Sequence, residues 1–506
     1  MKRKNIYIAL FAISLGFSSC SGWLDVNHDP NSPTDVSEDL IMAAPQAEIA
    51  AFVGGDIYNY SAFFAQYVDQ APEANQYNLL ADYDFDQDLF LYSYRGLYAY
   101  ALEDLETIRT KAKSAGNWGD YLVATTLRAY AYQILVDNLD YAPYTEALKG
   151  SSNAQPKWDD GETIYKGVMA EIDSAEAKVN SASNPTISQD LMLNKDVNQW
   201  IGFANALKLR MLMRGSEKND NSAAIEALVN EGKFFTGDVA FSSFSNETGK
   251  YNPWYGTWNY LAANNHVGSY PLVSFLKSTN DPRISNIFKK STKLSDYAGE
   301  VPNIFKGGYE AAQTHKNEYY SMLNVSTSST IMGPTAPVYY FTQSDLQFLL
   351  AEAYVRFFKN DAKAKVAYQA AIDADFSTRG LTTDQASTVY SSSSTQAWPS
   401  SGDESAKLKL IYTQKWVAMA MVNPAEGWAE MRRTDVPSVS SATAAQVYTN
   451  PTLGYTAGDL IYPYASALGT TLVKRVWYPE TVENLNPNTP KNETNLRTAN
   501  VWWDVK

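Results

Sequence analysis

Cysteine and histidine are almost absent from this sequence. The chain of 506 residues holds one cysteine, Cys20, and three histidines. A single cysteine excludes an intramolecular disulfide. Helical zinc sites require two histidines spaced three or four residues apart, and no two histidines of this chain have that spacing. The H-E-x-x-H and G-x-S-x-G signatures of zinc peptidases and serine hydrolases are absent too. The sequence therefore predicts no metal and no cofactor. It also disfavours an enzyme, although two carboxylates brought together by folding would suffice for a glycosidase.

Long apolar runs are almost absent as well. The one run of note covers residues 6–17 and follows three basic residues at positions 2–4. It is shorter than the ~20 apolar residues that span a bilayer. Two serines, the small residues that a peptidase needs, come directly before Cys20. This arrangement resembles a bacterial lipobox with an unusual Phe17, and we expect residues 1–19 to be a lipoprotein signal peptide.

Cleavage at that point leaves Cys20 as the first residue, carrying a thioether-linked diacylglycerol, with residues 20–36 as anchor and tether. Each buried acyl CH₂ contributes ~0.8 kcal/mol, so several chains on one residue hold a protein durably on a membrane. The alternative is an ordinary secreted protein with one free thiol, which is a liability in an oxidising compartment. The lipid anchor is the better interpretation.

Basic residues are in deficit. The chain has 41 Lys and Arg against 55 Asp and Glu, a net charge of −14, which becomes −17 without residues 1–19. This argues against nucleic-acid binding, which depends on basic side chains at phosphates. Aromatic residues are plentiful, with 12 Trp and 35 Tyr. Most must be core, but the supply also suits a surface that binds flat, weakly polar ligands.

Apolar residues recur at helical spacing through much of the chain. Gly215 is expected to cap the end of one helix, and Ser344 with Gln347 to form a capping box at the start of another. The predicted helices cover 95–112, 120–139, 162–179, 197–215, 344–358, 361–376 and 405–421.

Two of these helices have the spacing of a tetratricopeptide repeat. Ala364, Tyr368 and Ala371 match the second helix of that repeat, although Glu352 stands where the repeat prefers glycine. Helix pairs of this kind bury one face on the next pair and build a curved stack.

The sequence therefore predicts a mainly α fold in which tetratricopeptide-like helix pairs form a curved stack. A large irregular, loop-rich half is expected at roughly 235–342, and a second, Ser-rich loop at 383–403. No Pro/Gly-rich linker separates the halves, so residues 37–506 are predicted to form a single ligand-binding domain.

Two further patterns point to structure more than to chemistry. Acidic and amide residues alternate from 25 to 31 as in half a calcium loop, but Pro30 and Val36 occupy positions that need Gly and Glu.

The segment "WAEMRRTD" places Arg432 four residues after Trp428, the spacing of a cation–π contact along a helix. We interpret its charged cluster as ion pairing within the fold.

Five segments, in order along the chain, resemble the SusD/RagB family of Bacteroidetes outer-membrane lipoproteins, which bind nutrients. The region 305–313 departs from the family pattern. The segments are "WLDVNHDPNSPTD" (23–35), "NPWYGTW" with "YPLVSFLKSTNDPRISNIF" (252–288), "APVYYFTQSDLQFLLAEAYVRF" (336–357), "YTQKWVAMAMVNPAEGWAEMRRTDVP" (412–437), and "KRVWYPETVENLNPN" (474–488) with the terminal "VWWD" (501–504).

The resemblance implies a helical fold with four tetratricopeptide-like units and an irregular half that carries the ligand site. It also implies a partner, a TonB-dependent outer-membrane transporter of the SusC type. The lipoprotein would act as a lid on that barrel, facing the cell exterior, and would deliver oligosaccharides or peptides for uptake.

The stretch 251–266, "YNPWYGTWNYLAANNH", is the first candidate site. Aromatic rings in a segment broken by Gly, Pro and Asn have fewer ways to be buried than rings in a helix, and nearby amides can bind hydroxyls. Packing within the loop is the alternative role, and His266 is expected to be a solvated loop residue. The candidate ligand-binding residues here are Trp254, Tyr255, Trp258 and Tyr260.

The stretch 66–85 is the second candidate site. The resemblance implies ligand contacts from a loop in this general position, and we select Asn75, Tyr77 and Tyr83. A capping loop over the first helices is the alternative.

We favour a surface lipoprotein that captures oligosaccharides, because of the Trp and Tyr supply. The same scaffold importing peptides is the main alternative. A surface glycosidase and a structural adaptor of the tetratricopeptide type are the less favoured ones. Product release from a substrate would identify the glycosidase, and capture of a transporter without any ligand would favour the adaptor.

Overall fold

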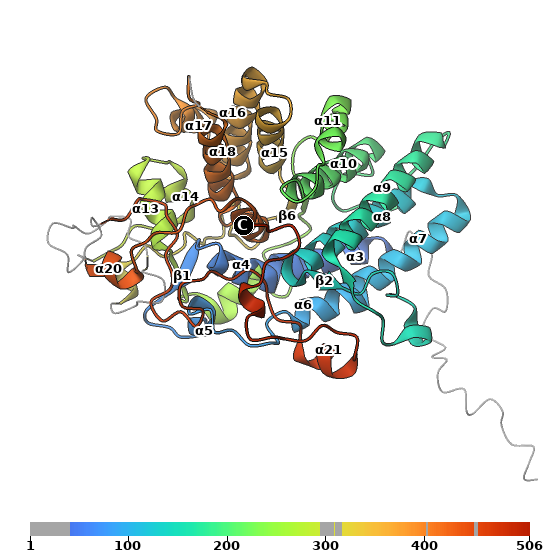
Figure 1. The fold of residues 1–506 in the computed structure, drawn as a ribbon, viewed down its shortest axis with the longest axis horizontal. Coiled ribbons are helices and arrows are strands. Elements are labelled where there is room, and N and C mark those ends of the chain that lie inside the picture. Colours follow the sequence, from blue (N-terminus) through green and yellow to red (C-terminus); the bar gives the residue numbers. More distant parts are fainter. Residues whose placement is uncertain (1–40, 294–307, 309–315, 401–402, 450–453) are drawn as a thin grey trace, which may run out of the picture.

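The computed structural model describes residues 41–293, 308, 316–400, 403–449 and 454–506 (Figure 1). The predicted signal peptide, Cys20 and the tether lie outside the described residues, as do His28, His315 and the calcium-like stretch. Within the described part, no helix is long and apolar enough to cross a membrane.

Paired helices form most of the molecule and fan out as a curved stack in Figure 1. Neighbouring pairs contact one another in order, so the predicted mainly α fold is confirmed. The pairs are α7 (Glu103–Ala115) with α8 (Trp118–Leu139), α9 (Gly161–Ser181) with α10 (Val197–Arg214), α15 (Gln343–Arg356) with α16 (Asp361–Thr378), and α18 (Glu404–Met419) with α19 (Pro424–Thr434).

Helix α8 lies at the centre of its part of the stack. It contacts α7, α9 and α10, and every residue of it except Trp118 is buried. A helix that is buried all round belongs to the interior of a large fold, and α8 has this place in the stack. The predicted helix at 95–112 is interrupted, because Leu97–Leu102 forms a π-helical turn, η2, between α6 (Leu91–Gly96) and α7.

Helix boundaries differ from prediction in two places. The N-cap of α15 is Thr342, whose hydroxyl accepts from Asp345 N at 3.1 Å, so the predicted capping box on Ser344 is wrong. The Ser-rich segment does not begin as a loop, because α17 (Thr383–Tyr390) starts there with a capping box between Thr382 and Gln385. Gly215 does end α10, as predicted.

The irregular half contains short elements joined by long connections, and it includes parts of 41–102 and 435–506 as well as the predicted 235–342. Three two-stranded antiparallel sheets occur among the described residues. The strand pairs are β1 (Val68–Gln70) with β5 (His266–Gly268), β2 (Tyr141–Ala142) with β3 (Asp159–Asp160), and β4 (Val239–Phe241) with β6 (Val338–Phe341).

The other short elements surround these strands. Those near the N-terminal half are α3 (Ala43–Phe52), η1 (Val53–Ile57), α4 (Tyr58–Phe64), α5 (Asn78–Ala81), η3 (Gly150–Asn153) and α11 (Ser222–Glu231). Those that follow are α12 (Pro253–Thr257), η4 (Trp258–Ala262), α13 (Tyr270–Ser278), α14 (Arg283–Ile287), η5 (Asn317–Tyr319), α20 (Ala444–Thr449), α21 (Glu480–Leu485) and η6 (Leu496–Thr498).

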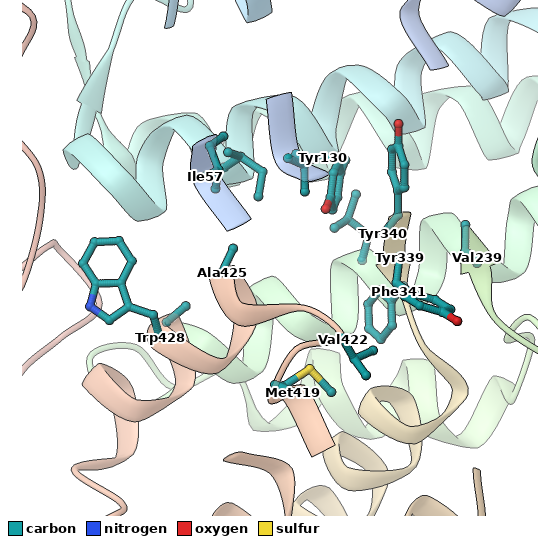
Figure 2. Close-up of a cluster of buried hydrophobic side chains, with 14 of the residues drawn as sticks. Ile57, Tyr130, Val239, Tyr339, Tyr340, Phe341, Met419, Val422, Ala425 and Trp428 are labelled. Atoms are coloured by element: carbon teal, nitrogen blue, oxygen red, sulfur yellow. The ribbon is translucent and has the colours of Figure 1, made fainter. Parts of the chain in front are cut away.

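Strand β6 joins the irregular half to the helical stack (Figure 2). All four of its residues are buried, and Tyr340 stacks on Tyr130 of α8 with ring centroids 4.8 Å apart. The main hydrophobic cluster runs without a break from Met42 to Trp503. The irregular half is therefore packed on the stack through a shared core.

Buried charges hold the helix pairs together beneath this core. Arg433 of α19 donates to Glu352 of α15 at 2.9 and 2.7 Å and forms an ion pair with Glu430 at 2.8 Å. The guanidinium carbon of Arg432 lies 3.7 Å from the Trp428 ring centroid. The predicted cation–π contact and the structural ion pairing are both confirmed.

Candidate functional site

A hollow of about 410 Å³ opens in the irregular half, and residues of α4 and α5 line it. Its size lies in the ordinary range of ligand pockets. Three segments that are distant in sequence form it. The lining residues are Gly55, Asp56, Asn59, Tyr60, Gln76, Tyr77, Leu79, Leu80, Phe85, Asp86, Leu89, Trp254 and Thr257.

Helix α12 presents Trp254 on one wall. Pro253 begins the helix, and the side chain of Asn252 caps it by accepting from Tyr255 N at 3.1 Å. The same Asn252 donates to Ala336 O at 2.9 Å, which ties the helix to the segment that leads into β6. Trp254 is only 4% exposed, so its indole presents an edge, rather than a full face, to the hollow.

The segment after β1 presents Tyr77 on the opposite wall. Its backbone N–H donates to the buried Gln70 at 2.7 Å, which fixes the start of α5. The Tyr77 ring is half-buried against Phe63, with centroids 5.6 Å apart. Burial, assisted by the nearby Asp56 carboxylate, raises the pKa of Tyr77 to about 12, so its hydroxyl remains a neutral donor.

His266 lies between the two walls. Its ring centroid is 5.1 Å from that of Tyr77 and 5.8 Å from that of Trp254, and Nε2 lies 2.9 Å from Asn59 Oδ1. The residue is 2% exposed and belongs to β5, so its predicted place in a solvated loop is wrong. Burial lowers the pKa of His266 to about 3, which keeps the imidazole neutral.

Polar groups complete the lining. Asp56, Gln76 and Asp86 are exposed at the hollow, and Asn59 is half-buried. Carboxylate and amide groups of this kind accept from and donate to hydroxyls. Among the described residues, no group of three or more His, Cys, Asp or Glu side chains could hold a metal ion. The arrangement can bind an uncharged polar ligand with apolar faces.

Two of the seven sequence-predicted residues, Tyr77 and Trp254, meet at this hollow. Each comes from a different predicted segment. The pairing of Val68–Gln70 with His266–Gly268 brings those segments together, because it places the two loops at one edge of a small sheet.

The other five predicted residues lie outside the lining. Asn75 and Tyr260 are exposed and Trp258 is half-buried, so these three remain on the accessible surface near α12 and α5. Tyr255 is 7% exposed and packs against Tyr251. Tyr83 is 1% exposed, and its hydroxyl accepts from Gln66 at 3.1 Å, so it is part of the core.

Sequence reasoning missed the third wall, which η1 and α4 supply through Asp56 and Asn59. The available signal was the pair Gly54–Gly55 inside a helical stretch. Gly55 has φ −108° and ψ −109°, outside helical values, at a π-helical segment. A second π segment, η4, follows α12 directly. Segments of this type are frequent at functional sites.

Comparisons with solved structures find the same fold in several proteins. A SusD homolog from Bacteroides uniformis has a TM-score of 0.72 at 19% identity, covering 93% of this chain and 100% of its own. A SusD/RagB family protein from Bacteroides thetaiotaomicron has a TM-score of 0.71 at 21% identity, covering 93% and 99%. A chitin-binding SusD homolog from Flavobacterium johnsoniae has a TM-score of 0.70 at 19% identity, covering 92% and 99%.

Comparison with curated protein sequences finds no match. The model of a protein family matches residues 30–453, which is most of the chain. That family is described as SusD-like, starch-binding and associating with the outer membrane. This chain therefore belongs to the SusD-like family of binding proteins.

Proposed function

We propose that this protein captures oligosaccharides at the hollow between Trp254 and Tyr77 and passes them to a membrane transporter for nutrient uptake. The observation that carries the proposal is the convergence of the Trp254 and Tyr77 rings with amide and carboxylate groups, from residues 55–60, 76–89 and 254–257. Sugar rings have apolar faces and hydroxyl edges, and this lining offers a partner for each.

The expected affinity is modest. A ring that covers roughly 100 Å² of apolar sugar surface contributes about 2.5 kcal/mol before the costs of association. Trp254 offers less than this because it is almost fully buried, so the half-buried Tyr77 supplies the larger share. Affinities on the order of micromolar to millimolar follow, which suits capture followed by release.

The family match and the chitin-binding relative support a glycan over a peptide as ligand. The family description also supports association with the outer membrane, and a lipid on Cys20 is the attachment that we propose. A SusC-like, TonB-dependent transporter is the proposed partner, and the protein itself is proposed to bind without catalysing any reaction. In this arrangement residues 37–506 act as one ligand-binding domain.

A binding screen tests the ligand class. The chain from Ser21 to Lys506 would be passed over starch, chitin and other polysaccharides, with peptide pools alongside, and retention would be measured. Retention by one glycan class, lost in Tyr77→Ala and weakened in Trp254→Ala, is the expected result.

Trp118→Ala is the matched control, because Trp118 is a half-buried tryptophan at the start of α8, outside the hollow. It should retain glycan binding. Binding of peptides alone would favour the peptide importer, and glycan binding untouched by both site variants would move the site away from this hollow. Release of shorter sugars during the assay would identify a glycosidase.

A further inference from the structure

A second hollow, of about 520 Å³, adjoins the first. Residues 84–88 form one side of it, and the C-terminal segment around α21 and η6 forms the other. In Figure 1, α21 and the chain that follows α5 lie side by side at the lower edge of the molecule. Phe85 and Asp86 line both hollows, so the two are neighbours on the molecule and meet at this pair of residues.

The second hollow has its own aromatic ring. Trp477 lines it and is half-buried, so part of the indole remains accessible. The guanidinium carbon of Arg497 lies 5.2 Å from the Trp477 ring centroid and 5.5 Å from that of Phe85, which places the cation beside both rings. Arg497 is held in turn by a hydrogen bond that it donates to Tyr83 O. The ring is therefore fixed before any ligand arrives, which lowers the entropic cost of binding.

The tyrosine that we predicted as a ligand contact thus has a supporting role here. Tyr83 has a positive φ of 61°, and its carbonyl accepts from Arg497. Its buried hydroxyl is held by Gln66 in the core. Tyr83 therefore ties Arg497, which lies beside the Trp477 ring, to the core.

Charge restricts what can occupy the second hollow. Four carboxylates line it, against the single guanidinium of Arg497, and Asp84 lies 3.8 Å from that guanidinium. The remaining carboxylates repel an anionic ligand at close range, since like charges near one another cost free energy. The ring and the carboxylates together suit a ligand that carries hydroxyl groups and no negative charge.

We propose that the second hollow is a further subsite for the same ligand, with Trp477 as its stacking ring, and that the protein selects sugar chains without negative charge that are long enough to occupy both hollows. This inference rests on the proposed glycan function. It adds that chain length and absence of negative charge determine affinity, and it assigns Trp477 to the far end of the bound chain.

Calorimetric titration with oligosaccharides of increasing length tests the inference. The probes are malto- and chito-oligosaccharides, with oligogalacturonides as the anionic probe, and the protein is the chain from Ser21 to Lys506. Affinity should rise with length until both hollows are filled. Trp477→Ala should lower the affinity of the long probes about tenfold and leave the shortest binding probe unchanged. Trp477→Phe, which retains a ring, should recover most of the loss.

Three outcomes separate this inference from the function on which it rests. If Trp477→Ala binds the long probes normally while Tyr77→Ala does not, the second subsite is wrong and the first hollow stands. If neither variant weakens any probe, the glycan site itself is wrong. If oligogalacturonides bind as tightly as neutral chains of equal length, the charge selection is wrong. Normal binding of the shortest probe by Trp477→Ala shows that this variant is folded.

Discussion

The single side chain of His266 makes the stability of the protein depend on pH, although its position in the sequence gives no sign of this. The imidazole is buried beside Trp254 and Tyr77, and burial lowers its pKa from 6.5 to about 3. The unfolded chain therefore binds a proton between these two pH values that the folded chain does not bind. Because the unfolded state holds more protons in this window, stability falls as the pH falls through it.

We expect His266→Gln to remove this dependence. Between pH 6.5 and about pH 4, the wild-type protein should lose on the order of 3 kcal/mol more free energy of unfolding than the variant. Urea denaturation of both proteins at several pH values measures the difference, and titrating carboxylates common to the two cancel in it. Parallel curves would mean that His266 is protonated in the folded protein.

Glu352 is a second residue whose role depends on distant partners. It stands where a tetratricopeptide repeat prefers glycine. The structure gives the reason, because the Glu352 carboxylate accepts hydrogen bonds from both terminal nitrogens of Arg433. Each side chain is about 1–2% exposed. Without the Glu352 carboxylate, the buried Arg433 would keep only Glu430 as an acidic partner among the described residues, and removing one member of a buried ion-pair cluster is strongly destabilising.

Glu352→Ala should therefore lower the free energy of unfolding by about 3–5 kcal/mol. Glu352→Gln, which retains an acceptor for Arg433, should lose less. The control is Glu247→Ala, because its ion pair with Lys250 has both side chains 64% exposed and should contribute at most about 1 kcal/mol. Denaturant titration of the three variants checks the order, and equal losses in all of them would contradict it.

At the scale of elements, η1 packs so closely against β6 that an added side-chain carbon would collide with it. A Cβ on Gly54 would lie 2.3 Å from Val338 Cγ2, a β-branched side chain with little rotamer freedom. A Cβ on Gly256 of α12 would meet nothing closer than Tyr251 Cβ at 3.8 Å. Each glycine is the chain neighbour of a residue that lines the first hollow, Gly55 or Thr257, yet their structural demands differ.

Gly54→Ala should lower the free energy of unfolding by about 1–3 kcal/mol and weaken glycan binding, because it displaces the segment that carries Asp56 and Asn59. Gly256→Ala should be neutral or should stabilise the protein by up to about 1 kcal/mol, since alanine favours a helix. Thermal unfolding and sugar titration of both variants measure these effects. A stable, fully binding Gly54→Ala protein would show that η1 does not position the site.

The elements also show which helices could be predicted from the sequence and which could not. Helical periodicity was sufficient to predict the stack, because a buried stripe leaves the same spacing in every pair. It did not predict α17, although the cap residues Thr382 and Gln385 stand in the printed sequence, because the serines that follow suggested a loop.

The candidate site was predictable only in part, and the reason is again physical. Tyr77 and Tyr83 are six residues apart in one polar segment, and nothing local distinguishes them. Pairing of β1 with β5 faces Tyr77 toward Trp254, while a hydrogen bond from Gln66 draws Tyr83 into the core. Such long-range pairing has no signature in either segment alone.

At the scale of the whole molecule, the attachment to a membrane that we propose rests on a lipid at Cys20. The chain carries a net charge of −14, and −17 without residues 1–19, so an anionic lipid surface repels it. The described residues contain no helix that could cross a membrane. In our proposal, acyl chains on Cys20 supply the attachment, at ~0.8 kcal/mol for each buried CH₂.

Cys20→Ala should therefore move the protein from the membrane fraction to the soluble fraction of cells that express it without a transporter partner. Fractionation followed by immunoblotting measures this, at low and high salt. The released protein should bind sugars as tightly as the chain from Ser21, because every residue that lines the two hollows lies beyond position 54. If Cys20→Ala stays with membranes at high salt, attachment does not depend on the lipid, and the anchor has to be sought in another part of the chain.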